Sequence, residues 1–186
     1  MGRINCSEDM LKEETVGVNE IFDGRVFKVV VKDILTAEGN PAKREVVLHN
    51  GGACVLPVDA DMNCYFVKQF RSPVETVLIE APAGKIEKGE EPFDCVRREI
   101  IEETGYTASD IESCGKMIAT PGYCSEFIYL YIASGLEYVG GNPDDNEYLS
   151  TFKVPLKDAV RMVEDGEIYD AKTCILIYKA ARRFGI

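Results

Sequence analysis

The segment at residues 84–106 restricts the fold of this chain more than any other part of the sequence. A helix is predicted at residues 91–104, because Pro92 is tolerated in a first helical turn and Gly105 can cap a helix C-terminus. One side of this helix is apolar and carries Phe93, Val96 and Ile100. The fold must therefore include a core that receives one short, capped, amphipathic helix.

Three carboxylates lie on the opposite face of the same helix, which is expected to be exposed. Glu99, Glu102 and Glu103 project together, and like charges at this spacing destabilise an isolated helix by roughly 0.2–0.5 kcal/mol per pair. Arg98 can pair with Glu102, which leaves Glu99 and Glu103 to bind a hard cation such as Mg²⁺ through oxygen. A solvated acidic helix face is the simpler alternative.

The charge balance argues against a nucleic-acid partner. The 21 Lys and Arg residues and 32 Asp and Glu residues give a net charge of −11, which repels a phosphate backbone. Apolar runs are far shorter than the roughly 18 residues of a membrane span, and no apolar signal segment opens the sequence, so we expect a cytoplasmic protein without a membrane partner. The seven cysteines form no Cys-x-x-Cys pair, which predicts free thiols, and the single histidine disfavours a zinc site.

The order of strand and helix patterns predicts an α/β fold in two parts. We place a small N-terminal antiparallel β lobe at residues 1–50 and a larger domain at residues 51–186. Strands are predicted at residues 25–35, 44–48, 53–58, 63–69, 127–133 and 148–154. Two further helices are predicted at residues 156–165 and 171–184, the second with Asp170 as its N-cap. A sheet of two or three strands is marginal alone, so the lobe should pack on the main domain or on a second subunit.

The spacing within residues 84–106 resembles the Nudix box of the Nudix hydrolases. Five residues separate Gly84 from Glu90, seven separate Glu90 from Arg98, and the pattern ends with Glu99, Ile100, Glu102, Glu103 and Gly105. Tyr106 stands where the family usually has an aliphatic residue. The resemblance implies an α/β/α sandwich that hydrolyses a nucleoside diphosphate linked to another group.

The resemblance also implies a metal site on the predicted helix. Glu99 and Glu103 would be metal ligands, the carbonyl of Ala83 would be another, and Arg98 would orient the carboxylates. An acidic protein needs a cation to bind an anionic diphosphate, and Mg²⁺, with Mn²⁺ as a substitute, can bridge the two. The Nudix resemblance and the charge argument therefore predict the same cofactor.

Segments outside the box are similar to the ADP-ribose pyrophosphatase branch of the family. They lie at residues 69–71, 80–84, 121–126, 144–147 and 166–173. Pro121 follows Tyr106 by 15 residues, a spacing associated with that branch. The resemblance implies hydrolysis of ADP-ribose to AMP and ribose 5-phosphate. It also implies a homodimer whose N-terminal lobes pack or exchange across a two-fold axis.

The branch implies contacts with the nucleotide. Arg71 would contact phosphate or the bound nucleotide, and Arg44 and Glu45 would hold the adenosine end of the substrate. An aromatic residue of the same lobe would stack on adenine, and Phe22 and Phe27 are the candidates, although core positions are the simpler interpretation of both.

Two loops would complete the site. Pro121 and Gly122 would begin a loop that brings Glu126 to the terminal ribose, and the acidic loop at residues 144–147 would supply Glu147 as a further metal ligand. The sequence leaves three rivals for the general base, which are Glu102, Glu126 and Asp145. A solvated acidic turn is the structural alternative for residues 144–147.

Three other functions stay open at this stage. The substrate could be a UDP- or GDP-sugar, because such relatives differ mainly in their base and sugar contacts. Tyr123, 17 residues after the box, matches a spacing seen in diadenosine polyphosphate hydrolases. A non-catalytic nucleotide-sensing Nudix module would usually have lost one of the box glutamates, and all three are present.

Overall fold

The computed structural model describes residues 8–141 and 149–186, and the described chain forms two compact units. The first unit runs to His49 and also includes Thr120–Glu126, a loop that the sequence does not group with the N-terminal lobe. The second unit contains the remainder of the described chain. Within residues 8–141 and 149–186, no helix combines the length and the apolar character needed to cross a membrane.

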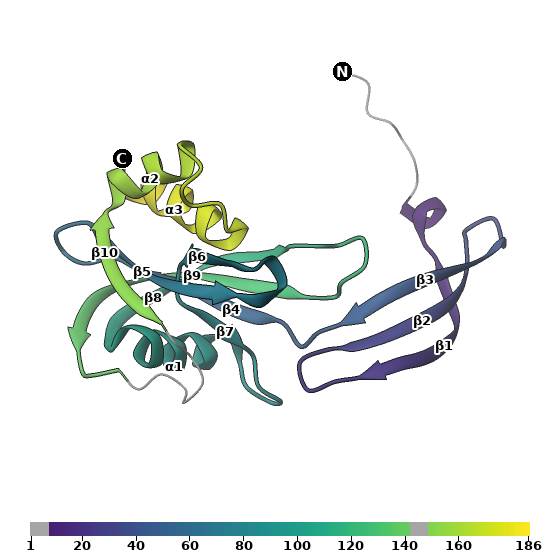
Figure 1. The fold of residues 1–186 in the computed structure, drawn as a ribbon. Helices are drawn as coiled ribbons and strands as arrows, with labels where there is room; N and C mark the ends of the chain where they lie inside the picture. Colours follow the sequence, from purple (N-terminus) through teal and green to yellow (C-terminus); the bar gives the residue numbers. More distant parts are fainter. Residues whose placement is uncertain (1–7, 142–148) are drawn as a thin grey trace, which may run out of the picture. The chain divides into compact units, whose positions relative to one another are not determined.

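The first unit is built on an antiparallel sheet in the order β1-β2-β3 (Figure 1). A short 3-10 helix (Glu8–Leu11) precedes β1 (Glu14–Asp23), β2 (Lys28–Leu35) and β3 (Pro41–Leu48). The predicted strands at residues 25–35 and 44–48 are confirmed as β2 and β3. Strand β1 was not predicted, because it is exposed along most of its length and has no buried apolar face.

The second unit contains two sheets (Figure 1), with strand orders β7-β4-β9-β8 and β10-β5-β6. Their strands are β4 (Gly52–Pro57), β5 (Asn63–Arg71), β6 (Thr76–Glu80), β7 (Ala83–Lys85), β8 (Tyr106–Ile118), β9 (Phe127–Tyr138) and β10 (Ser150–Pro155). A 3-10 turn (Ser72–Val74) links β5 to β6. Strands β4 and β9 pair in parallel, and the other neighbours pair antiparallel. The predicted strands of this unit are confirmed as β4, β5, β9 and β10, whereas β6, β7 and β8 were not predicted.

The three predicted helices are confirmed as α1 (Pro92–Thr104), α2 (Leu156–Glu164) and α3 (Ala171–Phe184). Helix α1 ends at Gly105, whose φ of +75° is in the left-handed region that favours glycine. Asp170 caps α3 by accepting the backbone N–H of Thr173 at 3.1 Å. On the apolar side of α1, Val96 and Ile100 are buried, whereas Phe93 is 44% exposed and its ring centroid lies 6.3 Å from that of the buried Tyr131.

Strand β4 lies at the centre of the core and is buried on both faces. Ala53 and Val55 share one apolar cluster with residues of α1. Cys54 and Leu56 share a second cluster with residues of α2 and α3. Because successive side chains of a strand point to opposite faces, the helices cover both sides of this sheet. The expected α/β/α sandwich is thereby confirmed.

Candidate active site

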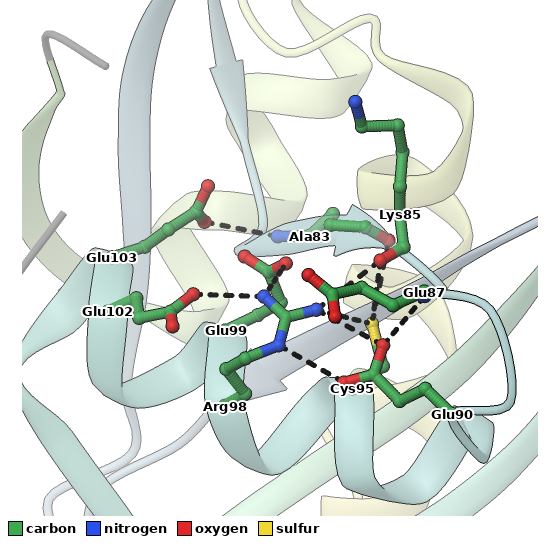
Figure 2. A network of polar contacts seen from close by, with 10 residues as sticks. Ala83, Lys85, Glu87, Glu90, Cys95, Arg98, Glu99, Glu102 and Glu103 are labelled. Carbon is green, nitrogen blue, oxygen red and sulfur yellow. Dashed lines mark hydrogen bonds and ion pairs between the residues drawn. The ribbon is translucent and has the colours of Figure 1, made fainter. Parts of the chain in front are cut away.

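Strand β7 and helix α1 hold the acidic residues of the box against each other. Gly84 of β7 pairs with Ala53 of β4, and the buried apolar side of α1 packs next to them. This packing turns two carboxylates inward, so that Glu99 and Glu103 are each 8% exposed, while Glu102 is half-buried. The expectation that all three lie on an exposed face was wrong, because β7 crosses the helix face that carries Glu99 and Glu103 (Figure 2).

Gly84 is needed because the Glu99 side chain occupies the space beside its Cα. A Cβ atom at this position would lie 1.6 Å from Glu99 Oε1 and 2.0 Å from Glu99 Cδ, so no other residue fits without displacing the carboxylate. The glycine that begins the box thus has a steric role. It creates the recess in which the Glu99 carboxylate lies.

Arg98 is the positive centre of the site (Figure 2). Its Nη1 lies 2.6 Å from Glu99 Oε1 and 2.9 Å from Glu102 Oε2, and its Nε donates to Glu90 Oε1 at 3.1 Å. The expected pair with Glu102 is confirmed, but Arg98 also pairs with Glu99, which corrects the expectation that this pairing leaves Glu99 available. Burial opposes the guanidinium charge, yet the hydrogen bonds that Arg98 donates to Glu90 and Glu99, together with the negative charge of Glu99, outweigh burial and raise the pKa of Arg98.

Glu103 contacts the backbone of β7. The N–H of Ala83 donates to Glu103 Oε2 at 3.1 Å (Figure 2). The hydroxyl of Thr151, on β10, donates to the main-chain carbonyl of Glu103 at 2.8 Å. The structure therefore brings Ala83 and Glu103 together through the Ala83 N–H, and a metal contact of the Ala83 carbonyl stays a prediction.

Arg71 is held by a buried carboxylate at the start of the β6–β7 connection. Its Nε and Nη2 donate to the two oxygens of Glu80 at 2.6 and 2.8 Å. Lys172 of α3 also pairs with Glu80. Glu80 and Lys172 were not among the predicted site residues, although both stand in segments that resemble the ADP-ribose pyrophosphatase branch. That segment similarity was the signal that could have found them.

The other candidate loop belongs to the first unit and is attached to the end of β3. The N–H of Val47 donates to the carbonyl of Tyr123 at 2.7 Å, and the N–H of Ser125 donates to the carbonyl of Val47 at 2.9 Å. Glu126 lies beside His49, with its Oε1 3.2 Å from His49 Nδ1. The loop that contains Pro121 and Gly122 is thus fixed to the same strand as Arg44 and Glu45.

Arg44 and Glu45 are exposed neighbours on β3, so their side chains point to opposite faces of the sheet. Arg44 pairs with Glu13, with its Nε 3.1 Å from Glu13 Oε2.

Phe22 and Phe27 contact each other, with ring centroids 5.9 Å apart, and both are exposed. Their interpretation as core residues is therefore wrong for the single chain. Asp145 and Glu147 lie outside the described residues.

Comparison with known proteins identifies the family of this chain. The NUDIX domain family model matches residues 48–174, which include the whole box. The chain belongs to the Nudix family. An ADP-ribose pyrophosphatase of Bacillus subtilis (strain 168) is 39% identical over 169 residues, which cover 90% of this chain and 91% of that protein. The family match and the similarity to this pyrophosphatase show that the chain is a Nudix hydrolase.

Other Nudix relatives have different names. A methanol dehydrogenase activator of Bacillus methanolicus is 36% identical over 90% of this chain and 92% of its own length. A GDP-mannose pyrophosphatase of Klebsiella pneumoniae is 30% identical over 82% of each chain. A solved structure described as an ADP compounds hydrolase superposes with a TM-score of 0.82 over 95% of this chain at 21% identity, which supports the Nudix fold.

The Nudix box of this chain has the donor chemistry for a divalent metal, which Nudix hydrolases generally use. Glu99 and Glu103 offer carboxylate oxygens next to β7, Glu99 beside Gly84 and Glu103 at the N–H of Ala83. Among the described residues, no three acidic, His or Cys side chains already converge on one metal position. Such a cage is not required, because Mg²⁺ is usually bound by one or two carboxylates together with water and substrate phosphates.

Proposed function

We propose that this Nudix hydrolase cleaves the diphosphate of ADP-ribose and releases AMP and ribose 5-phosphate, with Mg²⁺ as its ion and Mn²⁺ as a substitute. The observation that carries the proposal is the 39% identity to the Bacillus subtilis ADP-ribose pyrophosphatase over 90% of this chain. That similarity is longer than the family match at residues 48–174. It therefore extends beyond the catalytic domain that all Nudix hydrolases share.

Glu99, Glu103 and the carbonyl of Ala83 would hold the metal, with Glu147 as a further ligand. When bound, the ion supplies Lewis acidity at the phosphate oxygens and lowers the pKa of the attacking water. Arg98 keeps Glu99 and Glu102 in place and offsets part of their mutual repulsion. Like-charge repulsion within α1 is thereby reduced before substrate binds.

The general base is one of Glu102, Glu126 and Asp145. The pair with Arg98 at 2.9 Å restrains the Glu102 carboxylate. Glu126 is oriented by His49 at 3.2 Å, a geometry that suits either a base or a ribose contact. Comparing Glu102→Gln, Glu126→Gln and Asp145→Asn in one assay would assign the role.

The remaining site residues are proposed to bind the substrate. Arg71 would contact phosphate, and Arg44 and Glu45 would hold the adenosine end. Pro121 and Gly122 would shape the loop that carries Glu126. Arg71 uses two of its donors on Glu80, which orients the guanidinium and leaves part of it for an anionic ligand.

The N-terminal lobe is proposed to form a homodimer. Strand β1 is the edge of its sheet and exposes Val16, Val18, Ile21 and Phe22. An exposed apolar edge strand is unfavourable in a monomer, and a second copy would cover it. Sedimentation at micromolar concentration as a 20.7 kDa species would contradict the dimer.

The net charge of −11 supports a small anionic substrate bound through metal in preference to nucleic acid. The free thiols support a location in the reducing cytoplasm.

The proposed reaction is tested by its products. The protein is incubated with ADP-ribose and Mg²⁺, and AMP and ribose 5-phosphate are measured by chromatography. Equimolar release of both, abolished by a chelator and restored by excess Mg²⁺, is expected. Release of ADP and ribose would contradict cleavage within the diphosphate.

A GDP-sugar is the second candidate substrate, because GDP-mannose pyrophosphatases are 30–34% identical to this chain over 73–94% of its length. Such an enzyme would share the metal site and differ in its base contacts. A preference for GDP-mannose would therefore keep the assignments of Glu99 and Glu103 and reject those of Arg44 and Glu45.

A further inference from the structure

The first turn of α3 carries a buried cation that the proposed reaction does not use. The Lys172 side chain is 11% exposed, and its ammonium pairs with Glu80 and, at 2.9 Å, with Asp170. The Glu80 side chain is 3% exposed and also accepts two bonds from Arg71. We refer to Arg71, Glu80, Asp170 and Lys172 as the buried charge cluster.

The buried charge cluster is electrically balanced, with two cations and two carboxylates. Burial alone would raise the pKa of Glu80, but the hydrogen bonds and charges of Arg71 and Lys172 outweigh burial and lower it. Removal of either cation would leave an uncompensated carboxylate in a dry environment, which is costly. The four side chains therefore have little freedom to rearrange.

Thr173 connects this cluster to the backbone of the β6–β7 connection. Its hydroxyl donates to Asp170 Oδ2 at 2.5 Å and accepts the N–H of Ala81 at 2.8 Å. The carbonyl of Pro82 accepts the N–H of Val55 at 2.9 Å, and the proline ring restricts the backbone there.

One residue further along the chain, the N–H of Ala83 donates to the carboxylate of Glu103 at 3.1 Å. Ala81, Pro82 and Ala83 thus each make a hydrogen bond that holds the backbone. The bond of Ala83 is made with Glu103, a candidate metal ligand.

We propose that the buried charge cluster positions Glu103 for metal binding by fixing residues 81–83, with Lys172 as a positioning residue of the active site. The inference rests on the proposed function, because Glu103 is assigned as a metal ligand there. It gives a role to the Asp170–Thr173 segment, which is distant from the Nudix box in the sequence and contacts no reacting group in the proposed reaction. A purely structural role would stabilise the fold without changing metal affinity.

The test is the affinity of the free protein for Mn²⁺ alone. Binding is followed by loss of the electron paramagnetic resonance signal of the hydrated ion, far below the Tm of each variant. Lys172→Met keeps the apolar stem and removes the charge, and it should raise the Mn²⁺ dissociation constant roughly tenfold, as loss of outer-shell partners does. Lys179→Met, on the exposed side of α3, should bind like the wild type.

A matched control separates positioning from general loosening of the fold. Ile177 is fully buried on α3 and makes no polar side-chain contact, so Ile177→Val should lower Tm while Mn²⁺ affinity stays unchanged. If Ile177→Val weakens Mn²⁺ binding as much as Lys172→Met does, the proposal is wrong.

Two further variants keep the test decisive if Lys172→Met fails to fold. Thr173→Val preserves the shape of the side chain and removes the bond to Ala81, so it should also weaken Mn²⁺ binding several-fold, in line with loss of an outer-shell partner.

Glu103→Gln reports on the metal site itself. If it weakens binding while Thr173→Val and any folded Lys172→Met bind normally, the inference fails and the proposed function stands. If Glu103→Gln binds Mn²⁺ normally, the metal assignment fails and the inference fails with it.

Discussion

The Nη1 atom of Arg98 lies 2.6 Å from the Oε1 atom of Glu99, the residue that follows it in the chain. The same guanidinium also bonds Glu90 and Glu102, so one cation serves three carboxylates of the box. Glu99 and Glu102 would otherwise repel each other on adjacent turns of α1. The arrangement orients the acidic residues of the Nudix box before a metal or substrate binds.

Loss of Arg98 should therefore impair metal binding more than stability. In Arg98→Met the carboxylates lose their shared partner, and we expect kcat to fall roughly 10- to 100-fold, the range for residues that orient metal ligands. The Mg²⁺ concentration for half-maximal activity should rise at the same time. An unchanged Mg²⁺ requirement in a steady-state titration would contradict this role. Arg161→Met, on the exposed face of α2, is the control and should behave like the wild type.

Glu103→Gln should reduce kcat by at least about 100-fold, because a metal ligand stabilises transition-state charge by several kcal/mol. The amide oxygen can still accept the N–H of Ala83, so the Tm should change little. Steady-state kinetics and thermal unfolding measure the two effects separately, with the exposed Glu164→Gln as control. Near wild-type turnover would remove Glu103 from the metal site.

Gly84→Ala should inactivate the enzyme by displacing a ligand. The added Cβ would lie 1.6 Å from Glu99 Oε1, so the carboxylate must leave its recess or β7 must shift. We expect a kcat loss similar to that of Glu99→Gln and a Tm several degrees lower, because overpacking typically costs about 1–3 kcal/mol. An active Gly84→Ala variant would mean that Glu99 does not act from this recess.

The stability of the protein should fall in acid partly through Glu80. Its folded-state pKa lies below the ordinary value of 4.5, so the ionised carboxylate stabilises the fold above about pH 4.5. This stabilisation is lost as pH falls through the folded-state pKa. At pH 7 we expect Glu80→Gln to cost about 3 kcal/mol of unfolding free energy, and the difference from wild type should shrink below pH 4. A difference that is constant with pH in urea unfolding would contradict the pairing.

The structure also predicts slow thiol chemistry at three cysteines. Cys54, Cys64 and Cys95 are buried, and burial raises the pKa of the Cys64 and Cys95 thiols to about 12 and that of Cys54 still further. When the native protein is treated with a disulfide reagent at pH 8, these three cysteines should stay unmodified. In the unfolded chain, all cysteines should react. Rapid labelling of Cys95 in the native state would contradict its burial beneath β7.

The sequence predicted those parts of the fold that depend on local signals. Helix α1 is marked by Pro92 and Gly105, and α3 by Asp170 and Gly185, because caps act within a few residues of the chain. Strand β8 was missed because most of its residues are polar and only partly buried. Its pairing with β9 is a long-range contact that periodicity does not reveal.

The burial of the box carboxylates could not be predicted from helical periodicity. Glu99 and Glu103 are covered by β7. This strand is three residues long and has no strand pattern of its own. The bond from Arg98 to Glu90, eight residues earlier, likewise depends on the turn that brings β7 onto α1. The spacing of the box predicts which residues form the site, and tertiary packing decides how they face one another.

The most direct test of the central claim is the ratio of kcat/KM for ADP-ribose to that for GDP-mannose, measured on one preparation with Mg²⁺. We predict a ratio well above 10, which means more than about 1.4 kcal/mol of discrimination, and loss of both activities on addition of a chelator. A ratio below 1 would contradict the substrate assignment while preserving the Nudix metal site. Turnover that continues in chelator would contradict the metal-dependent mechanism itself.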